Sequence, residues 1–182
     1  YWISYILALN NQKKYEEAEI VSKKAIKHTP ESELIYFHAA VILQKLHKLD
    51  EAEKNYKKAI ELNPDYVDAH FNLSNFFYTI KKYKQSVEGY RQTIACNPHH
   101  VSAYNNLGNA LYALGKMKEA NISFIKAIEL KPDYPEAHAN YASSLYALGK
   151  FEEAAGSYKK AFELKPDYII AHLITSLPFL LF

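Results

Sequence analysis

Proline recurs at a fixed interval along this chain of 182 residues. Five of its seven prolines lie 34 residues apart, at Pro30, Pro64, Pro98, Pro132 and Pro166. The sequence around them repeats as well, because Glu-Leu-Lys-Pro-Asp-Tyr occupies both 129–134 and 163–168. A fixed period of this length indicates stacked structural repeats, each of which buries its apolar face against its neighbours. We therefore predict one solenoid over 1–182.

Small and aromatic residues hold fixed places in each repeat. With each closing proline numbered position 32, position 8 is small in four repeats, and position 24 is aromatic in the same four. Position 8 is Ala40, Ser74, Gly108 and Ala142, and position 24 is Tyr56, Tyr90, Phe124 and Tyr158. The first repeat departs from both patterns, with Ile6 and Ser22. A small residue lets two antiparallel helices approach closely, and the aromatic ring fills the space beside it.

Apolar spacing predicts two helices in each repeat. Tyr104, Leu107, Gly108 and Leu111 follow the i, i+3, i+4, i+7 spacing of one helix face. The expected first helices of the repeats are 1–12, 33–46, 67–80, 101–114 and 135–148. The expected second helices are 16–28, 50–62, 84–96, 118–130 and 152–164, so each proline falls just past a helix end.

The turn inside each repeat has its own signature. Gly115 and Gly149 stand where the first helix ends, and glycine takes the left-handed conformation there without strain. Lys13, His47 and Lys81 fill the same slot in the earlier repeats. We expect these three side chains to lower stability at their turns.

The whole pattern closely resembles the tetratricopeptide repeat, up to about Leu173. The resemblance implies an all-α, right-handed alpha-alpha superhelix of antiparallel helix pairs. Residues 169–182 would then be a partial sixth repeat, with 169–177 docked on 152–164 and an apolar end exposed. We expect either that the parent protein continues past Phe182 or that the chain self-associates through this C-terminal end.

In that family the first helices line a concave groove, and this places asparagines and tyrosines in its centre. An amide can pair with both the N–H and the C=O of a peptide, and tyrosine supplies contact area at low entropic cost. The expected peptide-binding residues are Phe71, Asn72, Asn75, Tyr78, Asn105, Asn106, Asn109, Tyr112, Asn140 and Tyr146.

Two functions fit this groove. The first is a protein–protein interaction scaffold that binds extended peptide segments. The second rests on Asn72, Asn106 and Asn140, which look like the asparagines that hold the substrate polypeptide in O-linked N-acetylglucosamine transferases. The chain would then be the substrate-recognition arm of a larger glycosyltransferase, which the sequence after Phe182 would decide. These asparagines could equally be common repeat residues that stack the solenoid.

Composition and motifs argue against several other classes. Twenty-two basic and 20 acidic residues give a net charge of +2, so neither nucleic acid nor an anionic membrane is an expected partner. Cys96 is the only cysteine, which precludes an internal disulfide and fits a cytoplasmic setting. No phosphate-binding loop, nucleophile elbow or carboxylate pair is present, so we expect no catalysis, cofactor or metal. His70, His138 and His172 share a repeat position and are expected to pack in the core.

Overall fold

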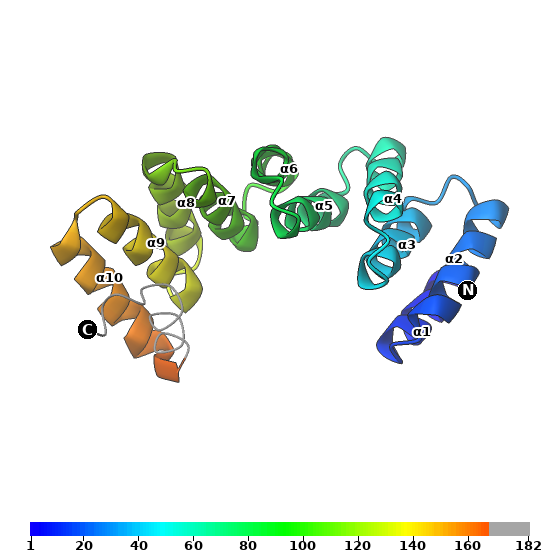
Figure 1. Cartoon of the computed structure of the whole chain (residues 1–182), viewed down its shortest axis with the longest axis horizontal. Helices are drawn as coiled ribbons and strands as arrows, with labels where there is room; N and C mark the ends of the chain where they lie inside the picture. The colour runs from blue at the N-terminus through cyan, green and yellow to red at the C-terminus, as the bar shows by residue number, and fades with distance from the viewer. Residues whose placement is uncertain (168–182) are drawn as a thin grey trace. The chain divides into compact units, whose positions relative to one another are not determined.

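The computed structural model describes residues 1–167, and that part of the chain consists of ten α-helices without a strand (Figure 1). The first helices of the repeats are α1 (Trp2–Asn11), α3 (Glu33–Lys45), α5 (Val67–Thr79), α7 (Val101–Ala113) and α9 (Pro135–Ala147). The second helices are α2 (Tyr15–His28), α4 (Leu49–Leu62), α6 (Tyr83–Cys96), α8 (Met117–Leu130) and α10 (Phe151–Leu164). The predicted all-helical fold and the alternation of first and second helices are confirmed.

The chain divides into two compact units. Unit 1 is Tyr1–Lys81 and contains α1 to α5, while unit 2 begins at Lys82 and contains α6 to α10. Within each unit, helices that follow one another along the chain pack together, as α3 does with α4 and α7 with α8. One continuous solenoid over 1–182 stays a prediction. The expected docking of 169–177 and the apolar C-terminal end lie outside the described residues.

A close approach between α7 and α8 sets the packing of that pair. The ring of Phe124 is 1% exposed and lies against Gly108. A Cβ atom added to Gly108 would come within 2.4 Å of the ring, so no larger residue fits there without a shift. Ala120 and Ala127 on α8 are fully buried, as the small-residue pattern predicts.

In the first repeat, the large residue lies on the first helix and the small residue on the second, the reverse of the α7–α8 pair. Ile6 stands at the position that Gly108 fills in α7, and Ser22 stands at the position of Phe124. Both are nearly fully buried, with Ile6 1% and Ser22 2% exposed. The hydroxyl of Ser22 donates to the carbonyl oxygen of Ala18 at 2.7 Å. A large residue on the first helix therefore offsets a small one on the second, and the two departures seen in the sequence compensate each other.

Within residues 1–167, all five turns between a first helix and its second helix adopt the left-handed conformation. The φ angle is 76° at Gly115 and 75° at Gly149. It is 59° at Lys13, 57° at His47 and 60° at Lys81, where a side chain must be accommodated. The predicted turn geometry is confirmed, and the three non-glycine turns carry backbone strain.

The histidines at the start of two first helices act as tethers. The Nε2 atom of His70 donates to the carbonyl oxygen of Pro64 at 2.8 Å, and Nε2 of His138 donates to that of Pro132 at 2.9 Å. Both rings are half-buried, so the expectation that they pack fully in the core is wrong for these two. Each ring instead fixes the loop that leads into its helix.

We predict opposite effects for two helical glycines. Gly108→Ala should lower stability by about 1–2 kcal/mol, because displacing the Phe124 ring outweighs the gain in helix propensity. Gly156→Ala on α10 should raise stability by about 0.5–1 kcal/mol, since nothing lies within 4 Å of the added methyl group. Urea unfolding followed by circular dichroism measures both, and equal shifts for the two variants would contradict the packing argument.

Two turn residues provide a second matched pair of variants. His47→Gly should raise stability by roughly 0.5–1 kcal/mol, because it relieves the left-handed strain at an exposed site. Gly149→Ala should lower it by about 1 kcal/mol, although the added methyl group meets no atom within 4 Å. The thermal unfolding midpoint reports both changes. A destabilised His47→Gly chain would show that the imidazole contributes more than its backbone strain costs.

Candidate peptide-binding groove

In unit 1, four of the expected binding residues lie on α5. Phe71, Asn72 and Asn75 are half-buried, and Tyr78 is 37% exposed. The Nδ2 atom of Asn72 donates to the carbonyl oxygen of Asp68, one turn earlier, at 2.8 Å. That bond orients the amide along its own helix and leaves the Asn72 oxygen as an acceptor.

In unit 2, three asparagines form a hydrogen-bonded chain between α7 and α9. Asn140 Nδ2 donates to Asn105 Oδ1 at 3.0 Å, and Asn105 Nδ2 donates to Asn106 Oδ1 at 3.1 Å. Asn105 is only 4% exposed. The same repeat position is buried in Phe37 and Ala139, at 9% and 0% exposed, so it belongs to the packing between first helices. Asn105 is therefore placed to orient its two neighbours and not to meet a ligand itself.

Tyrosine hydroxyls from the second helices reach the first helices. Tyr56 on α4 donates to Oε1 of Gln44 on α3 at 3.1 Å. The Tyr158 hydroxyl on α10 lies 2.9 Å from that of Ser143 on α9. Because Ser143 donates its own hydrogen to the carbonyl oxygen of Ala139, Tyr158 is the donor of this pair. The tyrosines at position 24 thus pack a ring in the core and also form a hydrogen bond with the first helix. The sequence analysis predicted the ring but not the hydrogen bond.

Phe124 breaks this arrangement in the α7–α8 pair, because its ring carries no hydroxyl. Asn109, at the α7 position that corresponds to Ser143, forms no side-chain hydrogen bond within the described residues. Its side chain is half-buried. The substitution of Phe for Tyr at position 24 was visible in the sequence and is the signal that could have singled out Asn109.

Three phenols lie close to one another on α7, α9 and α10, and Tyr112 among them is one turn after Asn109. Tyr112 is 38% exposed, while Tyr146 and Tyr158 are half-buried. Burial raises the pKa of the Tyr158 hydroxyl, the hydrogen bond with Ser143 lowers it, and the phenols of Tyr112 and Tyr146 raise it slightly. The Tyr146 ring also packs edge-on against Phe151, with centroids 5.1 Å apart. This side of α7 and α9 therefore combines one unbonded amide with aromatic surface.

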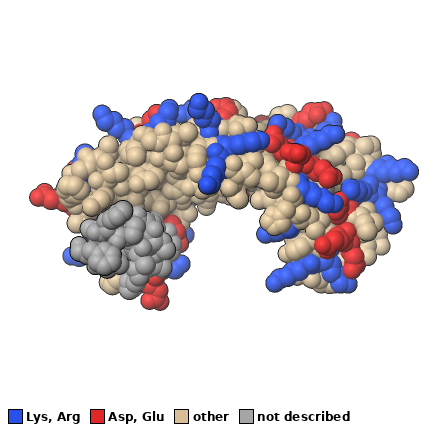
Figure 2. All heavy atoms as spheres, in the orientation of Figure 1, with Lys and Arg blue, Asp and Glu red and all other residues tan. Residues whose placement is uncertain are grey.

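Charge is nearly absent from these two helices. No charged residue occurs in α7, and Glu136 is the only one in α9, where it lies 3.7 Å from Lys165. In Figure 2, the described part of unit 2 shows a broad uncharged area, while charged side chains crowd the surface of unit 1. A neutral surface of amides and phenols suits a polypeptide better than a phosphate backbone.

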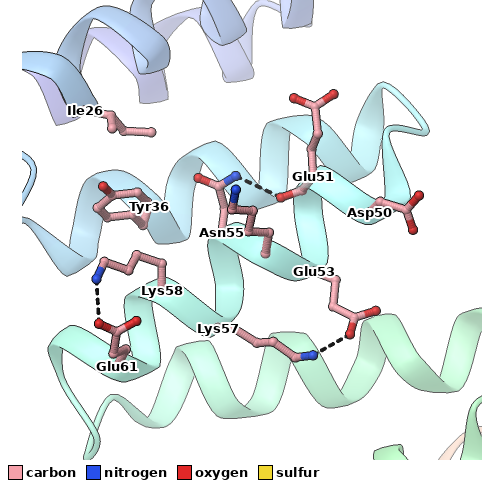
Figure 3. A pocket seen from close by; sticks show the side chains of 10 residues that line it. Ile26, Tyr36, Asp50, Glu51, Glu53, Asn55, Lys57, Lys58 and Glu61 are labelled. Atoms are coloured by element: carbon pink, nitrogen blue, oxygen red, sulfur yellow. Dashed lines mark hydrogen bonds and ion pairs between the residues drawn. The ribbon is translucent and has the colours of Figure 1, made fainter.

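A separate hollow of about 870 Å³ lies over α4 on the outer side of unit 1 (Figure 3). Ile26 from α2 and Tyr36 from α3 complete its lining. Two of its three lysines pair with acids on the same helix. Lys57 lies 2.6 Å from a carboxylate oxygen of Glu53, and Lys58 lies 2.6 Å from one of Glu61. These pairs are typical of a solvated helix face, so the hollow is not the candidate site.

Neither a metal-binding cluster nor a membrane-spanning helix is found within residues 1–167. No group of three or more His, Cys, Asp or Glu side chains is placed to hold a metal ion there. The helices in that range are also too short or too polar to cross a membrane.

Family comparisons recognise the same repeats. A family described as "TPR repeat" matches residues 45–81 and 108–148, and two described as "Tetratricopeptide repeat" match 135–168 and 90–120. Between them they match more than half of the chain. The chain belongs to the tetratricopeptide-repeat family. A comparison with curated protein sequences finds no significant match.

Solved structures share the fold. MamA from Desulfovibrio magneticus RS-1 is 20% identical, with a TM-score of 0.84 over 91% of this chain and 94% of that one. PilF from Pseudomonas aeruginosa is 21% identical, with a TM-score of 0.79 over 89% of this chain and 74% of that one. YrrB, described as "a TPR protein with an unusual peptide-binding site", is 20% identical, with a TM-score of 0.81 over 97% of this chain and 91% of that one. These likenesses establish the architecture of this tetratricopeptide-repeat chain.

Proposed function

We propose that this tetratricopeptide-repeat chain is a non-catalytic scaffold that binds an extended peptide along its first helices. The observation that carries the proposal is Asn109, a partly exposed amide without an internal hydrogen bond, one helical turn before Tyr112 on α7. Its oxygen accepts and its nitrogen donates, which matches the C=O and N–H that every peptide unit presents. Backbone pairing of this kind tolerates many partner sequences.

We divide the expected binding residues by role, according to the hydrogen bonds that they form. Asn105 and Asn140 join α7 to α9, so their replacement would leave buried polar atoms without partners and disturb folding as well as binding. Asn109 makes no such bond, and Tyr112 and Tyr146 contribute partly exposed rings. We therefore assign peptide contact in unit 2 to Asn109, Tyr112 and Tyr146, and positioning to Asn105.

Two further observations support a polypeptide ligand. The scarcity of charge on α7 and α9 disfavours nucleic acid, whose affinity depends on neutralising phosphates. YrrB, which shares the fold, is described by its own title as having a peptide-binding site. The compartment in which this scaffold works is proposed to be the cytoplasm, in keeping with its single cysteine.

The arm of a larger glycosyltransferase is the second candidate, favoured by the recurrence of asparagine at Asn72, Asn106 and Asn140. Both functions use the same groove. A nucleotide-sugar transferase domain in the adjoining sequence would decide for this candidate.

We predict that Asn109→Ala weakens peptide binding by roughly tenfold or more, because it removes a donor and an acceptor worth about 1 kcal/mol each. A linear peptide is first selected from a random displayed library on the intact chain, and its affinity is then measured by calorimetry. Asn55→Ala on α4 is the matched control, since it removes the same side chain from the outer face. Equal affinities of the wild-type and Asn109→Ala chains would place binding outside this groove.

A further inference from the structure

The outward face of α8 differs from that of every other described second helix. Four residues one turn apart form its outermost stripe: Lys118, Ile122, Ile125 and Glu129. Ile122 is 69% exposed and Ile125 is 39% exposed. The buried residues of α8, among them Ala120, Phe124 and Ala127, point to the opposite side. Two branched apolar side chains therefore face solvent together at the centre of this helix.

The equivalent positions of α4, α6 and α10 carry charge or no side chain. Where α8 has Ile122 and Ile125, α4 has Lys54 and Lys57, α6 has Glu88 and Arg91, and α10 has Gly156 and Lys159. In α2 one of the two positions is also isoleucine, Ile20, while the counterpart of Ile125 is Lys23. A solvated helix needs no isoleucine pair at these positions, and contiguous exposed apolar surface marks an interface.

The apolar surface continues into a hollow beside α8. The hollow has a volume of about 530 Å³ and is bounded by Ile94 of α6, Tyr104 and Leu107 of α7, and Ile122 and Ile125. Arg91 and Lys126 stand at its rim, and they lie 3.6 Å from Glu119 and 2.9 Å from Glu129, respectively. The rim thus offers no excess of one charge that would select a strongly acidic or basic partner.

The order of the stripe makes it complementary to itself. When two copies of α8 lie antiparallel, Ile122 of each copy faces Ile125 of the other, and Lys118 of each faces Glu129 of the other. Lys118 forms no ion pair within residues 1–167, and Glu129, which pairs with Lys126, is exposed. A two-fold axis requires this kind of isologous match, in which one patch meets its own copy.

We propose that a second copy of this chain covers the outer face of α8, giving a two-fold dimer through antiparallel α8 helices. The stripe is short, so the dimer is weak and depends on protein concentration. The buried side of α8 faces α7, so the contact leaves the peptide-binding side of α7 and α9 open. This proposal stands independently of peptide binding.

Sedimentation equilibrium of the intact chain over a wide concentration range tests the dimer. The wild-type chain should show a monomer–dimer equilibrium, which Ile122→Lys should shift by roughly tenfold or more toward the monomer. Ile20→Lys, the same change at the equivalent site of α2, should leave the equilibrium unchanged. Both sites are exposed, at 69% and 56%, so folding should survive, as circular dichroism would verify. An equilibrium that Ile122→Lys leaves unchanged, or a monomer at every concentration, would overturn the proposal.

Charge reversal tests the antiparallel register. Lys118→Glu places two carboxylates opposite each other in the dimer, and Glu129→Lys places two ammonium groups opposite each other, so each variant alone should dimerise more weakly than wild type. An equimolar mixture of the two variants restores one cation opposite one anion at both ends. The mixture should therefore form more dimer than either variant alone, and less at high salt. A mixture that dimerises no better than its components would overturn the antiparallel arrangement.

Discussion

The distance between the two helices of a pair is the constraint on which this structure depends. In α7–α8 that distance is set where the Phe124 ring meets the backbone at Gly108, because no atom can be added at Gly108 without displacing the ring. The other pairs keep the combined size of the two positions similar, as Ile6 and Ser22 do with their sizes exchanged. The same two positions recur in every described pair, so each pair is built on this spacing.

The same position links the core to the polar side chains of the first helices. A tyrosine there fills the space between the helices and sends its hydroxyl to the first helix, as Tyr56 does to Gln44 and Tyr158 to Ser143. Phenylalanine fills the space equally well but satisfies no polar group. A change of one oxygen atom in the core can thus decide whether a polar side chain of the first helix is hydrogen-bonded internally or left without a partner.

Much of this architecture could be predicted from the sequence, because a strict period makes each repeat evidence for the others. The helix boundaries, the left-handed turns at Lys13 and His47, and the buried small residues all follow from spacing. The roles of single polar residues could not be predicted, since they depend on which neighbour lies within hydrogen-bonding distance. Asn105 and Asn106 are the same residue type and adjacent in the sequence, yet Asn105 is buried between helices and Asn106 is half-buried. The half-buried position of His70 and the lack of a hydrogen-bond partner for Asn109 likewise depend on which atoms lie nearby.

The tethers made by His70 and His138 have a consequence for the form of each ring. A carbonyl oxygen can only accept a hydrogen bond, so Nε2 carries the hydrogen that reaches the proline carbonyl oxygen in both. A neutral imidazole has a single N–H, so its tautomer is fixed at these two positions and Nδ1 is left as an acceptor. A side chain without a donor at this distance from the backbone, such as phenylalanine, would release the loop that leads into α5 or α9.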